Sequence, residues 1–385
     1  MRVAYVGDII NNGKSLPTIG TSIVLLLSFM DEVQSVEVYC PSAKNTAEEF
    51  TFPEKVTVHE SYRYDDARSI LTLLNVKWKE YDTVIFNMLP TGFGHGSIAN
   101  AAALLIPLFL RYIWKLDNIR VIYHNSVYTN DIKFLGYNTL FDRIRALILG
   151  MVERQLFKSV ETFVLLQLYK DRIDSAIGKN RVKVMNGKYL EAITTLHMNN
   201  ALNSNITRSY QNHKPMILMH GSWGPQKNLK LALKALERLR KIGFDFSVIV
   251  SGGINHHFPD YEKMFMETMA NYSEVVDSYL GRVKEKDIMN LFLNADIVLL
   301  PYNTPGGHSG VLEQAMFFEA YTVALDFPEF REQSSCSSKV YLVSKEKFFD
   351  SLLSLLKMSA PDVPLNIRNK VLQTVKNVSR LLFNQ

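Results

Sequence analysis

Cysteine is scarce in this sequence, and its scarcity excludes one class of architecture. The 385 residues include two cysteines, Cys40 and Cys336, which lie far apart with no metal-ligand spacing around them. A disulfide-stabilised secreted scaffold is therefore excluded, and a reducing compartment is favoured. The first residues enter a strand-like run directly and lack the shape of a signal peptide, so we expect a cytoplasmic protein.

Uninterrupted apolar runs are also lacking. Residues 98–116 (IANAAALLIPLFLRYIWKL) are apolar almost all round, but Asn100 and Pro107 interrupt them. A single transmembrane span inside a series of alternating strands and helices would also divide the sheet. The segment therefore predicts a buried helix, or a helix with one face that touches lipid.

Charge is balanced overall but unevenly distributed. The chain holds 43 Lys/Arg against 38 Asp/Glu, a net charge of +5 at pH 7. Residues 111–188 alone hold 14 Lys/Arg against 7 Asp/Glu, a net of +7. Such a segment either faces phosphates or an anionic membrane surface, or is simply a solvated basic face.

Short apolar runs that alternate with helix-like segments predict an α/β protein with parallel sheets, and the length predicts two domains. The most informative stretch is residues 296–332. It combines a strand that ends at Tyr302, a glycine loop at Gly306 and Gly307, and a helix with Ser309 as its N-cap. Such a loop directs backbone N–H groups and a positive dipole end at an anion, and His308 adds a donor. A tight turn that binds nothing is the alternative.

A second glycine loop, residues 221–225, follows a predicted strand at 216–220 and precedes a predicted helix at 226–241. Lys227 falls in the first turn of that helix, where a positive charge opposes the helix dipole. A bound anion would offset the repulsion, so Lys227 is a candidate phosphate ligand. A solvated surface lysine is the alternative.

Candidate residues in the first half of the chain lie at the predicted carboxyl edge of its sheet. The strand at 120–125 ends at His124, which could hydrogen-bond a sugar or phosphate there, although a structural histidine is equally compatible. Two further loops contain glycine. One of them holds His95, and the other ends near Gly20. Residues 7–15 resemble a P-loop, but one residue too many separates the two glycines, so a nucleoside-triphosphatase is disfavoured.

Several short motifs occur along the chain in a particular order and spacing: Tyr123 to Asn125, Met185 to Gly187, Gly221 to Asn228, Tyr279 to Val283, Ala295 to Pro301, Gly307 to Leu312, Ala320 to Asp326 and Pro328 to Glu332. In that order they resemble the GT-B glycosyltransferases of the large retaining family four (glycosyl transferases group 1). The resemblance covers most of the second half and is thinner in the first.

This sequence departs from the family pattern at three places. Ser222 stands where the family has an arginine, so Lys227 alone remains there for the diphosphate. The family's two glutamates correspond to Gly306 and Gln314, and the amide keeps hydrogen bonding but loses charge. Ala320 takes the place of the glycine after the helix. A non-catalytic GT-B-like binding or scaffold protein, or an epimerase of nucleotide sugars, therefore remains an alternative.

The resemblance implies two Rossmann-like domains whose parallel sheets face each other across a cleft. It implies an acceptor-side domain at 1–200, a linker at 201–213, a nucleotide-sugar domain at 214–363 and a helix at 364–385 that returns to the first domain. The implied reaction is hexosyltransferase-like: a sugar passes from a nucleoside-diphosphate sugar to a glycan, lipid-linked or protein-linked acceptor, with retention and without a metal or other cofactor.

The resemblance also assigns roles to residues. The implied catalytic residues are His124, Lys227 and Gln314. The implied donor-binding residues are Gly221, Ser222, Trp223, Gly224, Arg282, Val283, Gly306, Gly307, His308, Ser309, Gly310 and Val311. Gly20 and His95 are expected on the acceptor side. The expected partners are the nucleotide sugar and its acceptor, without nucleic acid. The apolar helix at 98–110 and the +7 segment after it, and not the resemblance, prompt the further expectation of a peripheral contact with the inner membrane face.

Overall fold

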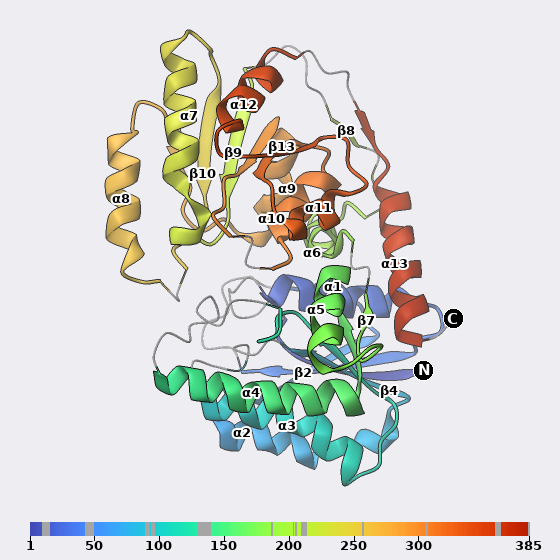
Figure 1. Cartoon of the computed structure of the whole chain (residues 1–385). Helices are drawn as coiled ribbons and strands as arrows, with labels where there is room; N and C mark the ends of the chain where they lie inside the picture. The colour runs from blue at the N-terminus through green and yellow to red at the C-terminus, as the bar shows by residue number, and fades with distance from the viewer. Residues whose placement is uncertain are drawn as a thin grey trace. The chain divides into compact units, whose positions relative to one another are not determined.

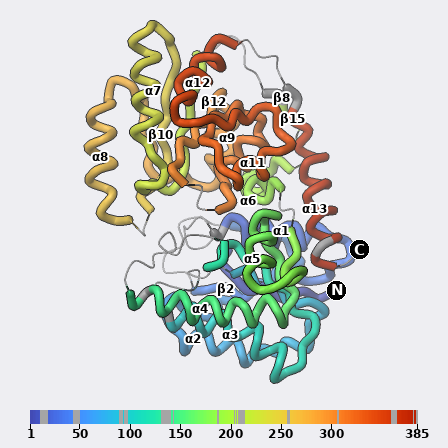
Figure 2. The backbone as a smooth tube through the Cα atoms, in the orientation of Figure 1, coloured from blue at the N-terminus to red at the C-terminus, as the bar shows by residue number. Residues whose placement is uncertain are grey.

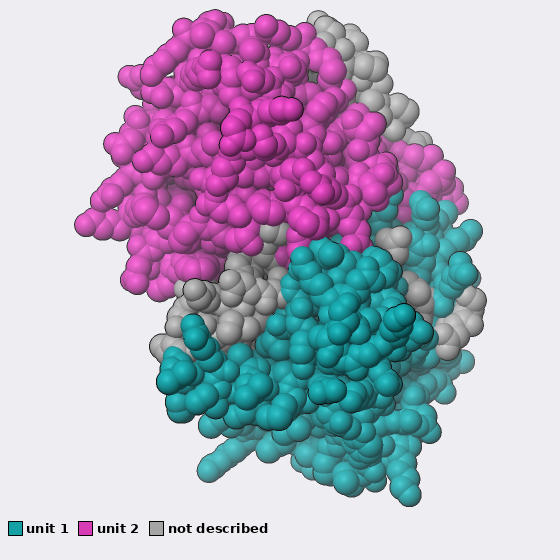
Figure 3. Space-filling view, in the orientation of Figure 1, with its two compact units in different colours: residues 1–190, 372–385 teal, residues 191–371 magenta. Residues whose placement is uncertain are grey.

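The computed structural model describes residues 1–9, 16–42, 50–88, 93, 97–129, 140–185, 188–202, 204, 206–208, 214–255, 258–304, 307–358 and 363–383. The chain forms two compact units, residues 1–190 with 372–385, and residues 191–371 (Figure 3). Each unit has its own parallel sheet with helices packed on it, so the predicted α/β class with two Rossmann-like domains is confirmed.

The first unit is built on a seven-stranded parallel sheet within its described residues, in the order β3-β2-β1-β4-β5-β6-β7. Its strands are β1 Arg2–Val6, β2 Ser35–Pro41, β3 Val56–Tyr62, β4 Thr83–Met88, β5 Ile119–Tyr123, β6 Glu161–Val164 and β7 Lys183–Val184. The strand order reverses between β1 and β4. The loops after these two strands therefore diverge at the carboxyl edge, the position where such sheets bind ligands.

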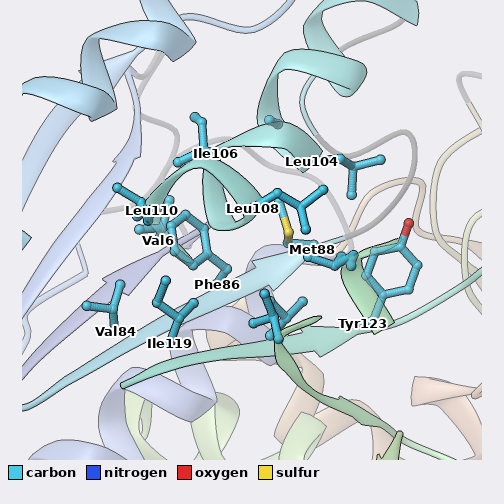
Figure 4. Close-up of a cluster of buried hydrophobic side chains, with 14 of the residues drawn as sticks. Val6, Val84, Phe86, Met88, Leu104, Ile106, Leu108, Leu110, Ile119 and Tyr123 are labelled. Carbon is cyan, nitrogen blue, oxygen red and sulfur yellow. The ribbon is translucent and has the colours of Figure 1, made fainter. Parts of the chain in front are cut away.

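The helices of this unit lie on both faces of the sheet, and α2, α3 and α4 cover one of them (Figure 1). Their bounds are α1 Leu16–Ser28, α2 Ala67–Leu71, α3 Ser97–Tyr112, α4 Leu140–Ser159 and α5 Gln167–Ile177, with short 3-10 helices at Thr72–Asn75 and Trp78–Glu80. Figure 4 shows Leu104, Leu108 and Leu110 of α3 above Phe86 and Met88 of β4. All five side chains are buried, so one face of the apolar segment at 98–116 packs on the sheet.

The structure answers part of the question whether the apolar segment at 98–116 contacts a membrane. Among the helices that the structure describes, none combines the length and apolar character that a membrane crossing needs. The helix α3 is nevertheless not buried all round, because Leu105 and Phe109 on its other side are 48% and 37% exposed.

The loop predicted to end near Gly20 is shorter than expected, because α1 begins at Leu16 and places Gly20 inside the helix. A Cβ atom on Gly20 would lie 2.0 Å from the backbone oxygen of Asp8. The glycine therefore allows α1 to approach the segment after β1, which is a packing reason for glycine at this position. The rest of the P-loop-like stretch, residues 10–15, lies outside the described residues.

A buried carboxyl group ties α4 to the segment that follows β5. Glu153 is fully buried and accepts hydrogen bonds from the Tyr123 hydroxyl (2.7 Å), the Ser126 hydroxyl and the Val127 N–H (3.2 Å). Burial raises the pKa of Glu153 from 4.5 to about 7, although these hydrogen bonds act in the opposite direction.

We expect the raised pKa of Glu153 to make unfolding pH-dependent. The folded state holds a proton that the unfolded state releases above pH 4.5, so this stability is full below pH 4.5 and is lost as pH rises to about 7. The loss corresponds to about 3 kcal/mol. Urea unfolding across this range should show the decline in wild type and a flatter profile in Glu153→Gln. A partly exposed control, Glu237→Gln, should keep the wild-type slope, and an unchanged slope in Glu153→Gln would contradict the assignment.

The second unit has a six-stranded parallel sheet within its described residues, in the order β11-β10-β9-β12-β13-β14. Its strands are β9 Met216–His220, β10 Ser247–Ser251, β11 Ser278–Tyr279, β12 Ile297–Leu300, β13 Tyr321–Leu325 and β14 Val340–Val343. Its order also reverses, between β9 and β12, so a second switch point lies at the carboxyl ends of these two strands.

Helices cover both faces of this sheet as well, and α7 and α8 lie side by side on one of them (Figures 1 and 2). The bounds are α6 Leu190–Met198, α7 Leu229–Lys241, α8 Tyr261–Asn271, α9 Glu285–Asn294, α10 Gly310–Phe317, α11 Pro328–Ser334 and α12 Phe348–Leu356. Apolar side chains of α7 and α12, such as Leu233 and Phe348, are fully buried against Val248 and Val323 of the sheet.

The division between the units lies at residue 190, ahead of the linker predicted at 201–213. The helix α6 falls with the second unit because Asn199 donates from Nδ2 to the backbone oxygen of Lys286 at 2.8 Å. Part of the predicted linker is a strand, β8 (Ile206–Arg208), which pairs antiparallel with β15 (Val363–Leu365). The last helix, α13 (Ile367–Phe383), begins in the second unit and ends in the first.

Candidate functional site

Three loops of the second unit meet at the carboxyl edge of its sheet. The loop after β9 bonds to the loop after β10, since the Gly221 N–H donates to the Ser251 oxygen (3.2 Å) and the Trp223 N–H donates to the Gly253 oxygen (2.8 Å). It also bonds to the loop after β12, where the Asn303 N–H donates to the Gln226 oxygen (2.8 Å). Several predicted residues from distant parts of the chain are therefore brought together at the switch point.

Lys227 does not lie in the first turn of an α-helix, and that prediction is wrong. Pro225 begins a short 3-10 turn, Pro225–Lys227, and Asn228 then takes the left-handed conformation with φ 49°. The helix α7 begins only at Leu229. The proposed dipole penalty inside the first turn does not apply, so the significance of Lys227 has to come from its surroundings.

The ammonium group of Lys227 lies in a partly buried, largely apolar environment. Its Nζ is 3.6 Å from the centroid of the Tyr302 ring and would be 3.6 Å from a Cβ atom on Gly221. Among the described residues no carboxylate pairs with it. Loss of hydration lowers the pKa of Lys227 to about 7. A bound anion would supply the missing charge partner.

A neighbouring histidine responds to the same environment. His220, at the end of β9, contacts the Ser251 hydroxyl through Nδ1 at 2.8 Å. Burial first, and the Lys227 charge second, lower the pKa of His220 to about 4. His220 is therefore neutral at physiological pH, and of these two residues only Lys227 can carry a positive charge there when an anion binds.

The helix start predicted after the glycine loop is confirmed. Ser309 caps α10 and accepts a hydrogen bond from the Leu312 N–H at 3.3 Å. Gln333 of α11 fixes Ser309 by accepting from its N–H (3.0 Å) and donating to its oxygen (3.2 Å). A Cβ atom on Gly221 would lie 3.6 Å from Cγ2 of Val311, so the α10 start adjoins the β9 loop. Gly307 has φ +115°, and Gly306 lies outside the described residues.

His308 has a partner that the sequence analysis did not foresee. Its Nε2 lies 3.0 Å from Oε1 of Glu313, and both side chains are buried. Nδ1 of His308 and Oε2 of Glu313 have no hydrogen-bond partner among the described residues. A neutral His308 that donates from Nε2 to Glu313 presents Nδ1 as an acceptor, whereas the doubly protonated ring would present a donor there.

Within the described part of the fold, the side-chain amide of Gln314 is hydrogen-bonded through its nitrogen but not through its oxygen. Its Nε2 donates to the backbone oxygen of Glu191 at 2.9 Å and to Oγ1 of Thr195 at 3.5 Å, and its Oε1 is buried without a partner among the described residues. The side chain can therefore offer an acceptor, but not a free donor, to a bound hydroxyl.

A carboxyl group of α6 lies at the start of α10. A Cβ atom on Gly310 would be 2.8 Å from the carboxyl carbon of Glu191, so glycine is needed for this approach. Burial, followed by the charges of Glu313 and Glu285, holds the pKa of Glu191 well above its usual range. Glu191 can therefore remain protonated and need not repel an anion at this helix start.

The remaining donor-side candidates differ in what they expose. The Trp223 indole is buried and donates from Nε1 to the Ser251 oxygen at 2.9 Å, and the Trp223 backbone bonds to Gly253 and Asn255, so this residue has a structural role. Ser222 and Val283 are partly buried, Gly224 is buried, and Arg282 is exposed on the loop after β11, an edge strand.

The sequence analysis matched the family's glycine after this helix to Ala320, but the backbone position that suits glycine is one residue earlier, at Glu319. Glu319 has φ 60°, which favours glycine, whereas Ala320 follows with its side chain buried. The Glu319 carboxylate compensates by pairing with Lys370 (2.6 Å) and Lys339 (3.7 Å).

Of the candidates in the first unit, His124 lies at the carboxyl edge of the sheet. His124 follows β5, is 6% exposed, and contacts Oδ1 of Asn87 on β4 through Nε2. His124 therefore has a structural partner at the expected edge. His95 lies outside the described residues.

Sequence reasoning missed three residues of the second site. Tyr302 could have been found, because it directly follows the strand whose loop was singled out. Glu313 adjoins Gln314, but it was overlooked because the family's glutamate was matched to Gln314. Glu191 had no local signal, since it reaches the site from α6, 119 positions before Gly310 in the chain. Within the part of the chain that the structure describes, no three His, Cys, Asp or Glu side chains group to hold a metal ion.

Comparison with known proteins agrees with this arrangement. Residues 214–358 match the family model described as Glycosyl transferases group 1. Among curated proteins, none matches the sequence.

Three solved structures share the fold across the whole chain. WaaG, a glycosyltransferase involved in lipopolysaccharide biosynthesis, has 16% identity and a TM-score of 0.60, covering 100% of this chain and 95% of that chain. HepE of Anabaena in complex with UDP has 13% identity and a TM-score of 0.57, with the same two coverages. The UDP-GlcNAc 2-epimerase of Methanocaldococcus jannaschii has 13% identity and a TM-score of 0.55, covering 100% of both chains.

At these identities the solved structures establish the fold, and the family model identifies the second unit. The match to the glycosyl transferases group 1 covers residues 214–358, less than half of the chain, and the whole chain has the GT-B fold.

Proposed function

We propose that the second unit binds a nucleoside-diphosphate sugar at the loops after β9 and β12, and that the chain transfers the sugar to an acceptor with retention and without a metal. The observation that carries the proposal is the partly buried Lys227 ammonium beside Gly221 and Tyr302, with no carboxylate partner among the described residues. UDP bound to HepE supports a nucleotide as the ligand of this fold.

The chemistry requires stabilisation of the diphosphate leaving group. Negative charge develops on it as the glycosidic bond breaks, and fixed donors in a water-poor site stabilise such charge more than water does. Lys227 supplies a full charge, while the start of α10 supplies N–H dipoles. A protonated Glu191 would donate a hydrogen bond instead of repelling the phosphate.

We assign sugar contacts to Gln314 and His308 through their free acceptor atoms. Gln314 Oε1 and His308 Nδ1 have no partner among the described residues. Gln314 can accept from a sugar hydroxyl but cannot carry the negative charge of the glutamate in related enzymes. No side-chain nucleophile is assigned.

A non-catalytic donor-binding protein is the second candidate. The observation in its favour is that the Gln314 amide nitrogen is already bonded to Glu191 and that no glutamate occupies this position. Both candidates predict nucleotide binding, so hydrolysis or transfer from a nucleotide sugar separates them. An epimerase, the third alternative, would convert the sugar without transferring it.

The first experiment is a thermal-shift screen with nucleoside diphosphates and their sugars. A specific donor should raise the melting temperature by mass action, by roughly 2.7 kcal/mol of stabilisation at a hundredfold excess over Kd. Incubation of the best ligand with candidate glycan and lipid-linked acceptors then measures transfer. No shift with any nucleotide would contradict the proposal. We place this activity in the cytoplasm because cysteine usage favours a reducing compartment.

We expect donor binding to depend on pH through Lys227. Its pKa is about 7 without ligand, and a bound diphosphate raises it, so binding takes up a proton above pH 7. Affinity for a nucleotide sugar should be constant below pH 7 and fall by up to about tenfold per pH unit above it. Calorimetry in buffers of different ionisation enthalpy measures the proton uptake. The Lys227→Gln variant should bind weakly and without this dependence. Equal affinity of wild type at pH 6 and pH 9 would contradict the role.

A further inference from the structure

The helix α4 in the first unit is apolar on two opposite faces. One face packs in the core through Ala146, Leu149, Leu156 and Phe157, which are all buried. The opposite face carries six side chains that are 50% to 76% exposed: Leu140, Phe141, Ile144, Leu147, Ile148 and Met151. Their spacing of i, i+1, i+4, i+7, i+8 and i+11 gathers them into one stripe along the helix. Packing in the core explains the first face but not the second.

The exposed stripe continues onto α3. The two helices pack against each other (Figure 1). The hydroxyl of Tyr112 on α3 contacts Ser159 of α4 and accepts a hydrogen bond from Nε2 of Gln155 at 2.6 Å. Beside it, Phe109 and Ile113 are 37% and 63% exposed. We group these α3 residues, which lie near the C-terminal end of α4, with the six of α4 as the α3–α4 face, and exposed apolar side chains gathered in this way usually mark an interaction site.

The charges around the α3–α4 face are basic. Helical spacing places Arg143 along one side of the α4 stripe and Arg145 along the other, and Arg154 and Lys158 continue toward its end. All four are exposed, and the Arg145 guanidinium lies 4.7 Å from the centroid of the Phe141 ring. Among the described side chains of α4, no carboxylate is exposed, since Glu153 is buried.

We propose that the α3–α4 face docks on an anionic lipid bilayer. An apolar stripe with arginines on both sides fits the boundary between acyl chains and phosphate headgroups, because the apolar side chains enter the boundary while the guanidinium groups bond to phosphates. A second copy of the chain fits less well. A two-fold contact through this stripe would bring the arginines of one copy toward those of the other. The proposal rests on this surface alone and is independent of the donor site.

The test is flotation of the full-length protein with phosphatidylcholine vesicles, with and without about 30 mol% phosphatidylglycerol. Wild type should float with the anionic vesicles at about 50 mM salt, and binding should weaken as salt rises. The double variant Leu147→Glu/Ile148→Glu should reduce the bound fraction by about tenfold or more. Arg143→Gln/Arg145→Gln should reduce binding to anionic vesicles at low salt by a similar factor.

A matched control comes from α8 of the second unit, where Met264 and Met266 are each 51% exposed. Met264→Glu/Met266→Glu adds the same charge at the same exposure and should float like wild type. Circular dichroism and nucleotide binding confirm that each variant is folded. Failure of wild type to float with anionic vesicles at low salt would overturn the proposal. An equal loss of vesicle binding in the α8 control would also overturn it. A third contradicting result would be a protein that does not float but forms a dimer in solution, if Leu147→Glu/Ile148→Glu dissociates that dimer.

Discussion

Substitution of Lys227 by methionine should reduce sugar transfer by about a hundredfold, the scale of losing one charge-stabilising donor. The ammonium is the one cation that the described β9 and β12 loops place beside both Gly221 and Tyr302. Because the diphosphate is the leaving group, the variant should lose both donor affinity and kcat. Steady-state kinetics with saturating acceptor measures both.

The same substitution should not destabilise the protein. Loss of hydration lowers the pKa of Lys227 to about 7, so the fold bears a cost for holding the charged form there. Lys227→Met should therefore melt at or above the wild-type temperature while losing activity, which is a pattern typical of functional sites. Lys230→Ala, an exposed lysine in the first turn of α7, is the matched control and should keep wild-type transfer. Unchanged kcat and affinity in folded Lys227→Met would reject the diphosphate role.

Substitution of Gly252 by alanine should have the largest effect on stability. Gly252 has φ +105°, and a Cβ atom would lie 1.8 Å from the backbone oxygen of Gly221. The loops after β9 and β10 would have to separate, at a cost of about 3 kcal/mol or more, since backbone strain and a steric clash add. Because Gly221 adjoins Lys227, nucleotide affinity should fall in whatever fraction remains folded.

The neighbouring glycine provides the control for this prediction. Gly253 has no atom within 4 Å of an added Cβ and lacks a left-handed φ. Gly253→Ala should therefore unfold within about 0.5 kcal/mol of wild type. Urea unfolding of the two variants compares them directly, and equal stability of Gly252→Ala and Gly253→Ala would show that the contact with Gly221 is not tight.

The fold was predictable because its signal is local and repeated. Alternating strands and helices required two parallel sheets, and Ser309 marked a helix start that the structure confirms. The start of α7 was misplaced because Pro225 and Asn228 split one apparent helix into a 3-10 turn and a helix. Periodicity of leucines cannot reveal a left-handed residue that precedes them.

The site was predictable only where its residues lie on the predicted loops. Gly221, Lys227 and Val311 meet as the switch-point rule suggests. Glu191 comes from a helix that the sequence placed in the other domain, and its contact with Gly310 depends on tertiary packing. The partner of His308, Glu313, also depends on packing, because it requires the helix and the preceding loop to fold back on each other.

The exposed stripe of α4 shows a different limit. The sequence drew attention to the apolar segment at 98–116, and α3 does bury one side of it. In the segment at 140–151 the sequence pattern cannot say which of two apolar faces meets the core. Burial in the structure decides this, and it leaves the six large apolar side chains of α4 in solvent.

A structure of this protein with a bound nucleoside diphosphate tests the central claim most directly. The account predicts diphosphate oxygens within hydrogen-bond distance of the Lys227 ammonium and of the backbone N–H groups at the start of α10. A nucleotide bound in the second unit away from both, or bound only in the first unit, would contradict it.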